Sequence, residues 1–418
     1  MRKILIILPW LPYPITSGGH QALFSSIFAI KNDFDVYLAY EAFNDKKHND
    51  ARYSFLKILP EVTLLPFLRK KSNKKWLMSV KKILKSFLLK RKFNQCSYVD
   101  VCNRWEQTVR PLDSDWLNFI DDICNKYDFD IIQVEMPWMI SQVLTLPKKP
   151  IKIFVHHELG FVCRKLESLK LINTPYVNAY KTYVDLNELA LLELYDLIVT
   201  LSPNDVFKLQ EKGLKTPVVT SFASIDVNSI ELSMNLNNYD CFHLTFVGPS
   251  SHYPNVEGLK WFLNNCWEKL LSKDNRYKLT VVGVWSEKYR IDFSQNYDNI
   301  EFAGFVDSLS DYLCGSIMIV PITIGSGIRM KILESCAIGA PIVSTIVGAE
   351  GIHLKDGEDC FITDDPNVFV DDIIKLQDSA LRKRFIVNAR QMVKDCFSLE
   401  ALRKNRLQIY NEILGAKN

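Results

Sequence analysis

The sequence predicts an α/β protein with two doubly wound domains, and two observations support this prediction. Short apolar runs alternate with helical patterns through the first half of the chain, and the same alternation starts again in the second half. The length of 418 residues also suits two hydrophobic cores better than one. Because open sheets of this kind bind ligands outside the carboxyl ends of their strands, candidate site residues are sought in the loops that follow strands.

The expected strands are short apolar runs of four to eight residues. In the first half they lie at 4–8, 34–40, 130–135, 151–157, 196–202 and 217–222, and in the second half at 242–248, 277–284, 299–306, 316–323 and 340–345. The polar stretch 223–240 is expected to link a first domain, residues 1–225, to a second, residues 240–397. A last helix is expected from about residue 398 to residue 415.

Composition excludes several classes of protein. With 48% hydrophobic and 24% charged residues, long disordered regions are not expected. The 10 cysteines are scattered without a metal-ligand spacing, which is typical of reduced thiols in the cytoplasm. The apolar run from Ile4 to Leu8 is too short for the core of a signal peptide, and no run of about eighteen apolar residues predicts a membrane span.

One segment, residues 67–93, breaks the alternation because it contains eleven Lys or Arg and no acid. Apolar residues that include Trp76 recur there at helical spacing, and Lys81, Lys82 and Lys85 lie beside them. Such a helix suits the anionic surface of a cytoplasmic membrane, at about 1 kcal/mol per basic residue. In the alternative, the apolar stripe packs on the first domain and the lysines are only solvated. Nucleic acid is not expected as a partner, since no stacking platform or known module accompanies the charge.

The segment from Gly325 to Gly351 holds the strongest candidate site. A glycine-rich loop follows the expected strand 316–323 and opens a helix, so its backbone N–H groups can face an anion. Arg329 and Lys331 add positive charge there, and Glu334 can accept hydrogen bonds from two ribose hydroxyls. This pattern predicts a site for a nucleoside diphosphate, with the binding residues Gly325, Ser326, Gly327, Ile328 and Glu334. In the alternative, Lys331 and Glu334 form a surface ion pair at i, i+3 spacing.

Two loops of the first domain are further candidates. Gly18 and Gly19 follow the first strand and precede a helix, which allows close approach of a phosphate. The pair His156-His157, followed by Glu158, ends the strand 151–157. A histidine there can hydrogen-bond a sugar, and Glu158 can orient an acceptor, although a single histidine at a strand end is often structural. The sequence leaves open which of the two histidines is exposed.

The chain resembles glycosyltransferase family 4, the GT-B group of retaining transferases that use nucleotide sugars. The resemblance rests on the segment from Gly325, on the opening ILIILPWLPYPITSGGHQ, on LSPNDVFKL from Leu201 and on FVGPSSHYPNVEGLKWF from Phe246. It implies a GT-B fold, with two Rossmann-like domains that face a central cleft and a C-terminal helix, residues 398–418, that packs back on the first domain. It also favours His157 over His156, and it implies that Gly18, Gly19 and Gly248 contact the donor.

The sequence departs from the family pattern at two places. The family has two glutamates eight positions apart, of which the second matches Glu334 while the first falls on Ser326. Its usual basic pair after the first strand of the second domain is also missing. The stretch 248–260 has no arginine, and its one lysine, Lys260, lies well inside the expected helix. We therefore expect Arg329 and Lys331 to compensate the charge of the leaving diphosphate.

No cofactor and no metal are expected. Asp128-Phe129-Asp130 matches an Asp-x-Asp metal motif, but these carboxylates precede their strand and so lie at its amino end, away from the ligand side. Fixed cations, Arg329 and Lys331, are the other way to stabilise a leaving diphosphate.

The function expected from these features is hexosyl or related transfer, with retention, from a nucleoside diphosphate sugar to a glycan or lipid-linked glycan in surface polysaccharide assembly. The enzyme would act in the cytoplasm, peripherally on the inner face of the membrane. A sugar-nucleotide epimerase and a non-catalytic partner subunit with the same fold are the alternatives. A nicotinamide dehydrogenase is disfavoured, since neither half has G-x-G-x-x-G after its first strand.

Overall fold

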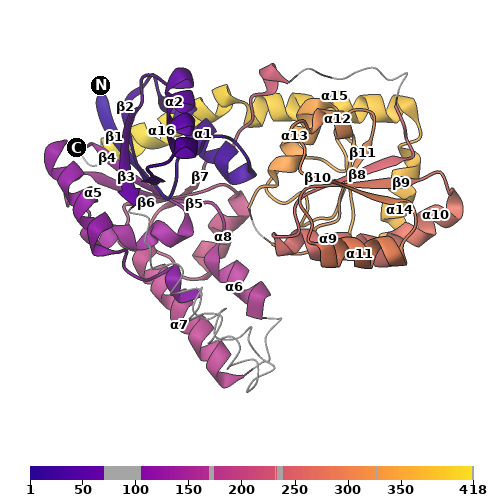
Figure 1. Cartoon of the computed structure of the whole chain (residues 1–418), viewed down its shortest axis with the longest axis horizontal. Helices are drawn as coiled ribbons and strands as arrows, with labels where there is room; N and C mark the ends of the chain where they lie inside the picture. The colour runs from indigo at the N-terminus through magenta and orange to yellow at the C-terminus, as the bar shows by residue number, and fades with distance from the viewer. Residues whose placement is uncertain (70–104, 169–173, 231, 233–238, 326, 417–418) are drawn as a thin grey trace. The chain divides into compact units, whose positions relative to one another are not determined.

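The computed structural model describes residues 1–69, 105–168, 174–230, 232, 239–325 and 327–416. The chain forms two compact units, one of Met1–Ser221 with Asn405–Asn418 and one of Phe222–Lys404. Each unit contains its own parallel sheet, as the alternation of apolar runs and helical patterns predicts. The trace of each unit can be followed in Figure 1.

The first sheet has the strand order β3-β2-β1-β4-β5-β6-β7, and all its neighbouring strands are parallel. Its strands are β1 (Arg2–Leu8), β2 (Phe34–Phe43), β3 (Thr63–Arg69), β4 (Ile131–Glu135), β5 (Ile151–His156), β6 (Leu197–Thr200) and β7 (Val218–Thr220). The order reverses between β1 and β4, where Ile4 pairs with Ile131. The carboxyl ends of these two strands therefore border the position at which such sheets bind ligands.

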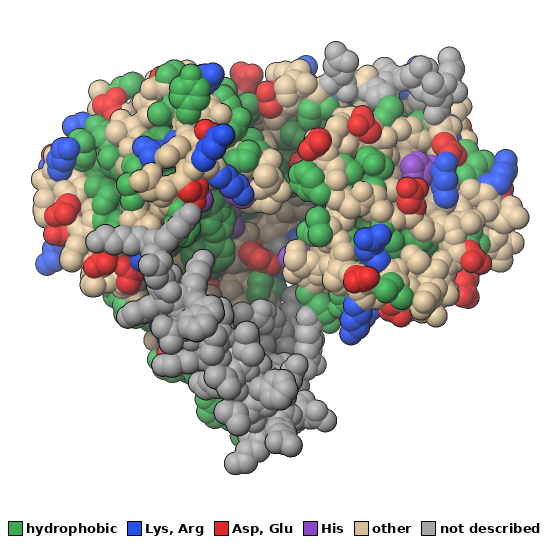
Figure 2. Space-filling model, viewed as in Figure 1, with side chains coloured by type: hydrophobic (Ala, Val, Ile, Leu, Met, Phe, Trp, Pro, Cys, Tyr) green, Lys and Arg blue, Asp and Glu red, His purple; other side chains and the backbone are tan. Residues whose placement is uncertain are grey.

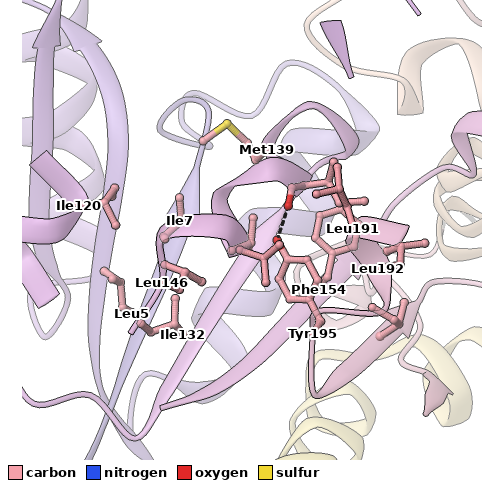
Figure 3. Packing of buried hydrophobic residues seen from close by; sticks show 14 of the residues in the cluster. Leu5, Ile7, Ile120, Ile132, Met139, Leu146, Phe154, Leu191, Leu192 and Tyr195 are labelled. Atoms are coloured by element: carbon pink, nitrogen blue, oxygen red, sulfur yellow. Dashed lines mark hydrogen bonds between the residues drawn. The ribbon is translucent and has the colours of Figure 1, made fainter. Parts of the chain in front are cut away.

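The core of the first unit lies between this sheet and its helices. The helices are α1 (Gly18–Ile30), α2 (Lys46–Ile58), α5 (Ser114–Lys126), the 3-10 helix η1 (Pro137–Thr145), α6 (Gly160–Ser168), α7 (Pro175–Leu192), α8 (Pro203–Glu211) and the later part of α16 (Leu399–Ala416). Figure 3 shows Phe154 of β5 next to Tyr195, whose hydroxyl donates to the carbonyl of Ile140 at 2.8 Å. The buried Tyr195 hydroxyl is thus satisfied within an otherwise apolar cluster.

The second sheet repeats the same topology in the order β10-β9-β8-β11-β12-β13, again with parallel neighbours. Its strands are β8 (His243–Val247), β9 (Lys278–Val282), β10 (Ile300–Gly304), β11 (Ile317–Val320), β12 (Ile342–Ser344) and β13 (Phe361–Ile362). The order reverses between β8 and β11, so the loops after these two strands meet at the switch point of this sheet.

Helices cover both faces of the second sheet. Figure 1 shows α9 and α11 on one side and α12, α13 and α15 on the other. The helices are η2 (Val227–Ser229), α9 (Tyr253–Phe262), the π-helical η4 (Leu263–Trp267), α10 (Glu268–Lys273), α11 (Glu287–Asn296), α12 (Ser310–Leu313), α13 (Met330–Ile338), α14 (Pro366–Lys375) and α15 (Ser379–Phe397).

The first part of the stretch expected to be a linker belongs to the second unit. Ile225 pairs with Ser398 in an isolated parallel bridge, and Nη2 of Arg390 donates to the carbonyl of Ile230 at 2.7 Å. The end of the chain returns to the first unit, since the Tyr410 ring of α16 lies 5.4 Å from the Phe34 ring. The chain thus passes from the first unit to the second after Ser221 and returns after Lys404.

Figure 2 shows one face of the molecule. On this face, basic and acidic side chains are mixed over the described residues of each unit. The basic segment lies almost wholly within residues 70–104, which are outside the described residues, and so do the expected membrane contacts Trp76, Lys81, Lys82 and Lys85. No helix in the described part of the chain is long and apolar enough to cross a membrane.

Candidate functional site

A glycine-rich loop follows β11 at the switch point of the second sheet. Gly325 and Gly327 have φ angles of 129° and 79°, which side-chain-bearing residues rarely adopt. A Cβ on Gly325 would lie 2.9 Å from Nη2 of Arg329, the N-cap residue of α13. Nη1 of Arg329 donates to the carbonyl of Gly327 at 2.5 Å, so the loop wraps around this guanidinium. Ser326 is outside the described residues.

Lys331 connects the first turn of α13 to the loop after β8. Its Nζ donates to the carbonyl of Val247 at 2.8 Å and to Oδ1 of Asn255 at 3.0 Å, and it lies 4.9 Å from the centre of the Phe246 ring. Burial, together with the charge of Arg329, lowers the pKa of Lys331 to about 7. The lysine therefore changes its charge near neutral pH, and an anion beside it would favour the charged form.

Glu334 lies one turn further along α13. Burial raises the pKa of its carboxyl to about 7. No described residue donates a hydrogen bond to it, and the ion pair with Lys331 that the i, i+3 spacing allows is not formed, because Lys331 points to Val247 and Asn255. Ile328, also expected at this site, is half-buried in the loop before the helix.

The loop after β8 is held in a tight conformation beside α13. Gly248 has a φ of 147°, and a Cβ there would lie 2.5 Å from the Asn255 amide, which itself donates to the carbonyl of Pro249 at 3.0 Å. Trp285 donates from Nε1 to the carbonyl of Gly248 at 2.8 Å. Asn255 thus contacts both the loop and Lys331. The sequence alone did not predict this role. The one feature of the sequence that could have indicated it is the position of Asn255 in the first turn of the helix after Gly248.

In the first unit, His157 lies at the end of β5 and contacts a carboxylate on the neighbouring strand. Its Nε2 is 2.7 Å from Oε2 of Glu135, and the His157 side chain is 11% exposed. Oε1 of Glu135 accepts from Gln133 at 2.6 Å, and Gln133 in turn accepts from the Tyr410 hydroxyl at 2.6 Å. Glu158 is half-buried at the same strand end. Glu135 was not among the residues expected from sequence.

His156 is part of a different, buried cluster. Its side chain is 0% exposed, and its Nε2 lies 3.1 Å from Oε1 of Glu188. Burial acts to raise the pKa of Glu188, but the hydrogen bond from His156 and the charge of Arg164 outweigh it and lower the pKa to about 2. Arg164 also donates from Nε to Asp185 at 2.7 Å. The enclosed position gives His156 a structural role and leaves His157 as the more accessible of the pair.

Gly18 and Gly19 form the start of α1, where Ser17 caps the helix by accepting from the backbone N–H of His20 at 3.3 Å. Neither glycine has a positive φ. A Cβ on Gly19 would lie 3.7 Å from Cε of Met136, an ordinary contact. The fold therefore tolerates a side chain at position 19. The glycine at this position leaves the N-terminus of α1 open to close approach by a ligand.

The two aspartates of the Asp-x-Asp pattern serve other contacts at the start of β4. Oδ2 of Asp130 accepts from the backbone N–H of Lys3 at 2.7 Å, and Asp128 pairs with Lys149 at 2.6 Å. Within the described ranges, no three His, Cys, Asp or Glu side chains are grouped as metal ligands.

Comparisons with known proteins concern the second unit and the fold of the whole chain. Residues 241–379, which contain the Gly248 loop and the start of α13, match the family model described as glycosyl transferases group 1. The whole chain resembles TarM, with a TM-score of 0.68, 11% identity and 99% of each chain covered. The chain has the GT-B glycosyltransferase fold.

Two other GT-B structures resemble it over the full length. Sucrose-phosphate synthase from Thermosynechococcus elongatus has a TM-score of 0.68 and 14% identity, with 100% of each chain covered. Anabaena Alr3699/HepE, solved in complex with UDP, has a TM-score of 0.64 and 11% identity, with 99% of this chain and 100% of that chain covered.

A curated relative matches part of the chain. An uncharacterized 44.6 kDa protein in the cps region of Klebsiella pneumoniae is 26% identical over 268 residues. That alignment covers 60% of this GT-B chain and spans 65% of the relative's length.

Proposed function

We propose that this GT-B protein is a retaining glycosyltransferase that moves a sugar from a nucleoside diphosphate sugar to a glycan in surface polysaccharide assembly. The observation that carries the proposal is the placement of Arg329 and Lys331 beside a glycine-rich loop at the switch point of the second sheet. The match to group 1 glycosyl transferases over 241–379, the UDP bound by Alr3699/HepE and the cps-region relative support it.

On the donor side, the proposed reaction places negative charge on the leaving diphosphate. Backbone N–H groups of the Gly325–Gly327 loop and the cations Arg329 and Lys331 would stabilise that charge without moving far, because the surrounding helix and loop already hold them. Glu334, with no donor from the described residues, would accept hydrogen bonds from the ribose hydroxyls. Ser326, Ile328 and Gly248 would complete the wall around the nucleotide.

On the acceptor side, the proposal assigns the sugar contact to His157. The hydrogen bond to Glu135 fixes the ring and favours a proton on Nε2, which leaves Nδ1 as the acceptor. Glu158 would orient the acceptor, and Gly18 and Gly19 would let the diphosphate approach the N-terminus of α1. No carboxylate is proposed as a covalent nucleophile.

The proposed reaction uses no metal and no cofactor. Transfer should therefore continue at the same rate when a chelator removes divalent cations, and a loss of rate that Mg²⁺ or Mn²⁺ restores would contradict this part of the proposal.

We place the reaction at the inner face of the cytoplasmic membrane, with a lipid-linked acceptor, because the basic segment suits an anionic surface. Co-sedimentation with phosphatidylglycerol vesicles should be lost when Lys81, Lys82 and Lys85 are replaced by Glu. Unchanged binding of this variant would remove the membrane contact from the proposal.

The decisive experiment combines nucleotide binding with transfer. Thermal unfolding should shift upward with UDP or another nucleoside diphosphate, since a ligand of the native state stabilises it. Transfer is then measured from the matching nucleotide sugar, with the anomeric proton of the product followed by NMR to test retention. Binding without turnover would favour a non-catalytic partner subunit, and an isomerised donor in the absence of acceptor would favour an epimerase.

A further inference from the structure

A pocket of about 200 Å³ opens in the first unit where β1 and β2 end. Its wall comes from the loop after β1, the start of α1, the end of β2 and helix α2. None of the residues assigned above to sugar transfer lines it. The pocket is therefore a separate recess on the same edge of the sheet as His157.

Two cations of α2, Lys47 and Arg52, line this pocket without a carboxylate partner among the described residues. The acidic group in the wall, Glu41, is already engaged, since it accepts from Nη2 of Arg69 at 2.6 Å. His48 is held by Asp45 at 2.7 Å. The charges of Lys47 and Arg52 are thus left to attract an anion.

Three buried polar atoms in the same wall have no hydrogen-bond partner in the described part of the protein. They are Nε1 of Trp10, the hydroxyl of Tyr40 and Nε of Arg52. Each can donate a hydrogen bond, and Trp10 and Arg52 cannot accept one there. Burial raises the pKa of Tyr40 to about 12, although the charge of Arg52 acts against this shift, so the phenol remains a donor. Because buried donors are normally paired, three of them in one wall indicate an absent acceptor.

Aromatic rings form another part of the pocket wall. Trp10 and His20 both line the pocket, with their ring centres 5.8 Å apart, and Trp138, outside the lining, lies 5.5 Å from the Trp10 ring. Burial lowers the pKa of His20, which keeps this ring neutral and able to hydrogen-bond a hydroxyl. An apolar face next to cations suits a sugar that carries a negative charge.

We propose that this pocket binds an anionic group, a phosphate or a carboxylate, carried by the sugar acceptor; the inference rests on the transferase function proposed above. Lys47 and Arg52 pair with the anion, and Tyr40 and Trp10 donate to it. β2 and β5 are three positions apart in the sheet, so the pocket lies roughly 15 Å from His157. The anion is therefore recognised at a distance from the reacting hydroxyl, and acceptors without it are disfavoured.

The experiment measures binding of three probes to the full chain at constant ionic strength: glucose 6-phosphate, glucuronate and glucose. We expect one or both anionic probes to bind, and glucose to bind at least about tenfold more weakly, a difference typical of charge-assisted hydrogen bonds. Binding of the phosphate alone assigns a phosphate to the acceptor, and binding of glucuronate alone assigns a carboxylate.

Matched variants locate the binding site. Lys47→Gln and Arg52→Gln should each weaken anionic probe binding at least about fivefold, as expected for the loss of one charged partner. Lys57→Gln removes the same charge from the far end of α2 and should bind the probes like the parent. Lys47 is exposed, so Lys47→Gln keeps the test valid if Arg52→Gln fails to fold.

The proposal is overturned if glucose binds as tightly as the anions, if neither anion binds, or if Lys47→Gln and Lys57→Gln behave alike. These outcomes differ from failure of the transferase function. Probe binding that depends on Lys47, in a protein that transfers no sugar, would leave the pocket in place and refute the transferase. Sugar transfer that does not depend on Lys47 would support the transferase function and refute the role of the pocket.

Discussion

Nε2 of His157 lies 2.7 Å from Oε2 of Glu135, and this contact joins the ends of two neighbouring strands. The carboxylate is 2% exposed, and its second oxygen accepts from Gln133. Gln133 accepts in turn from Tyr410 of the C-terminal helix α16. A chain of three hydrogen bonds therefore fixes the orientation of the candidate catalytic histidine from a helix more than two hundred residues away in sequence.

Glu135→Gln should lower turnover by about ten- to a hundredfold, because a neutral amide oxygen accepts the Nε2 proton of His157 less strongly than the carboxylate and holds the ring less firmly. The Michaelis constant for the nucleotide sugar should change little, since Glu135 hydrogen-bonds His157 and Gln133, neither of which is assigned to the nucleotide. Steady-state kinetics over a range of pH would measure both. A folded Glu135→Gln protein with the parent's turnover and pH profile would contradict the role of this contact.

Tyr410→Phe tests whether the effect extends along the chain of hydrogen bonds. Loss of the donor to Gln133 should destabilise the protein by about 1 kcal/mol, as for a typical buried hydrogen bond. Turnover should fall by a few-fold at most, because Glu135 still reaches His157. Urea unfolding and turnover measured on the same preparation would check both expectations. A loss of turnover equal to that of Glu135→Gln would show that α16, rather than the carboxylate, controls the histidine.

Lys331→Ala should lower turnover by about two to three orders of magnitude, the usual cost of removing one group that stabilises transition-state charge. Lys260→Ala is a suitable control, since this lysine of α9 contacts the Tyr289 ring at 5.6 Å and is not assigned to the donor. Circular dichroism would verify the fold of both variants. Turnover of Lys331→Ala within a few-fold of the parent would refute the assignment of charge compensation to Arg329 and Lys331.

The affinity for UDP should fall as the pH rises above 7, because the pKa of Lys331 in the free protein is about 7. Diphosphate stabilises the charged lysine, so binding takes up a proton above this pH and weakens by at most about tenfold per pH unit. Calorimetric titration between neutral and alkaline pH would measure this dependence. Lys331→Arg, whose side chain stays charged, should bind with little change over the same range; an equal decline in this variant would assign the effect to another group.

The central strands could be predicted because both of their faces are buried. β1 and β11, for example, read as continuous apolar runs in sequence. The edge strands β3 (Thr63–Arg69) and β13 (Phe361–Ile362) were missed. β3 is mostly half-buried, and its Pro66, which is tolerated at an edge, divides the apolar pair Leu64-Leu65 from Phe67-Leu68, so the segment does not read as a typical strand. β13 has two residues, too few for any periodicity.

The candidate site was predicted where its residues are close in sequence and missed where they are not. Arg329, Lys331 and Glu334 lie within two turns, and their spacing already places them beside one loop. Asn255 enters through its hydrogen bond from Lys331 of α13, and Glu135 enters through the register of β4 and β5; the sequence specifies neither contact. The one local signal for Glu135 was its polar character within the buried strand IIQVE.

Glu334→Gln should stabilise the protein in a pH-dependent way. The pKa of Glu334 is raised to about 7 in the folded state, so ionisation costs the folded protein more than the unfolded chain. Below the unfolded pKa both forms are neutral and parent and variant should be equally stable. The stability gain should grow as the pH rises toward 7 and then level off at about 1–3 kcal/mol. Urea unfolding at several pH values would show this, and a gain that persists at low pH would contradict burial of the carboxyl as the cause.

Gly283→Ala should destabilise the protein near the loop after β8, and Gly304→Ala is its matched control. Both glycines have positive φ, 124° and 75°, and Gly283 donates from its N–H to the carbonyl of Gly304 at 2.7 Å. A Cβ on Gly283 would lie 2.8 Å from the carbonyl carbon of Gly248, whereas a Cβ on Gly304 meets nothing within 4 Å. Gly304→Ala should therefore cost about 1 kcal/mol for backbone strain alone.

Gly283→Ala adds a steric clash to this strain, so roughly 2–4 kcal/mol of stability should be lost. The clash also displaces Gly248, the residue that follows Val247, whose carbonyl accepts from Lys331. UDP affinity should fall in Gly283→Ala and stay near the parent value in Gly304→Ala. Urea unfolding and UDP titration would separate the two effects, and equal affinity in both variants would show that the position of Gly248 is not needed to hold the nucleotide.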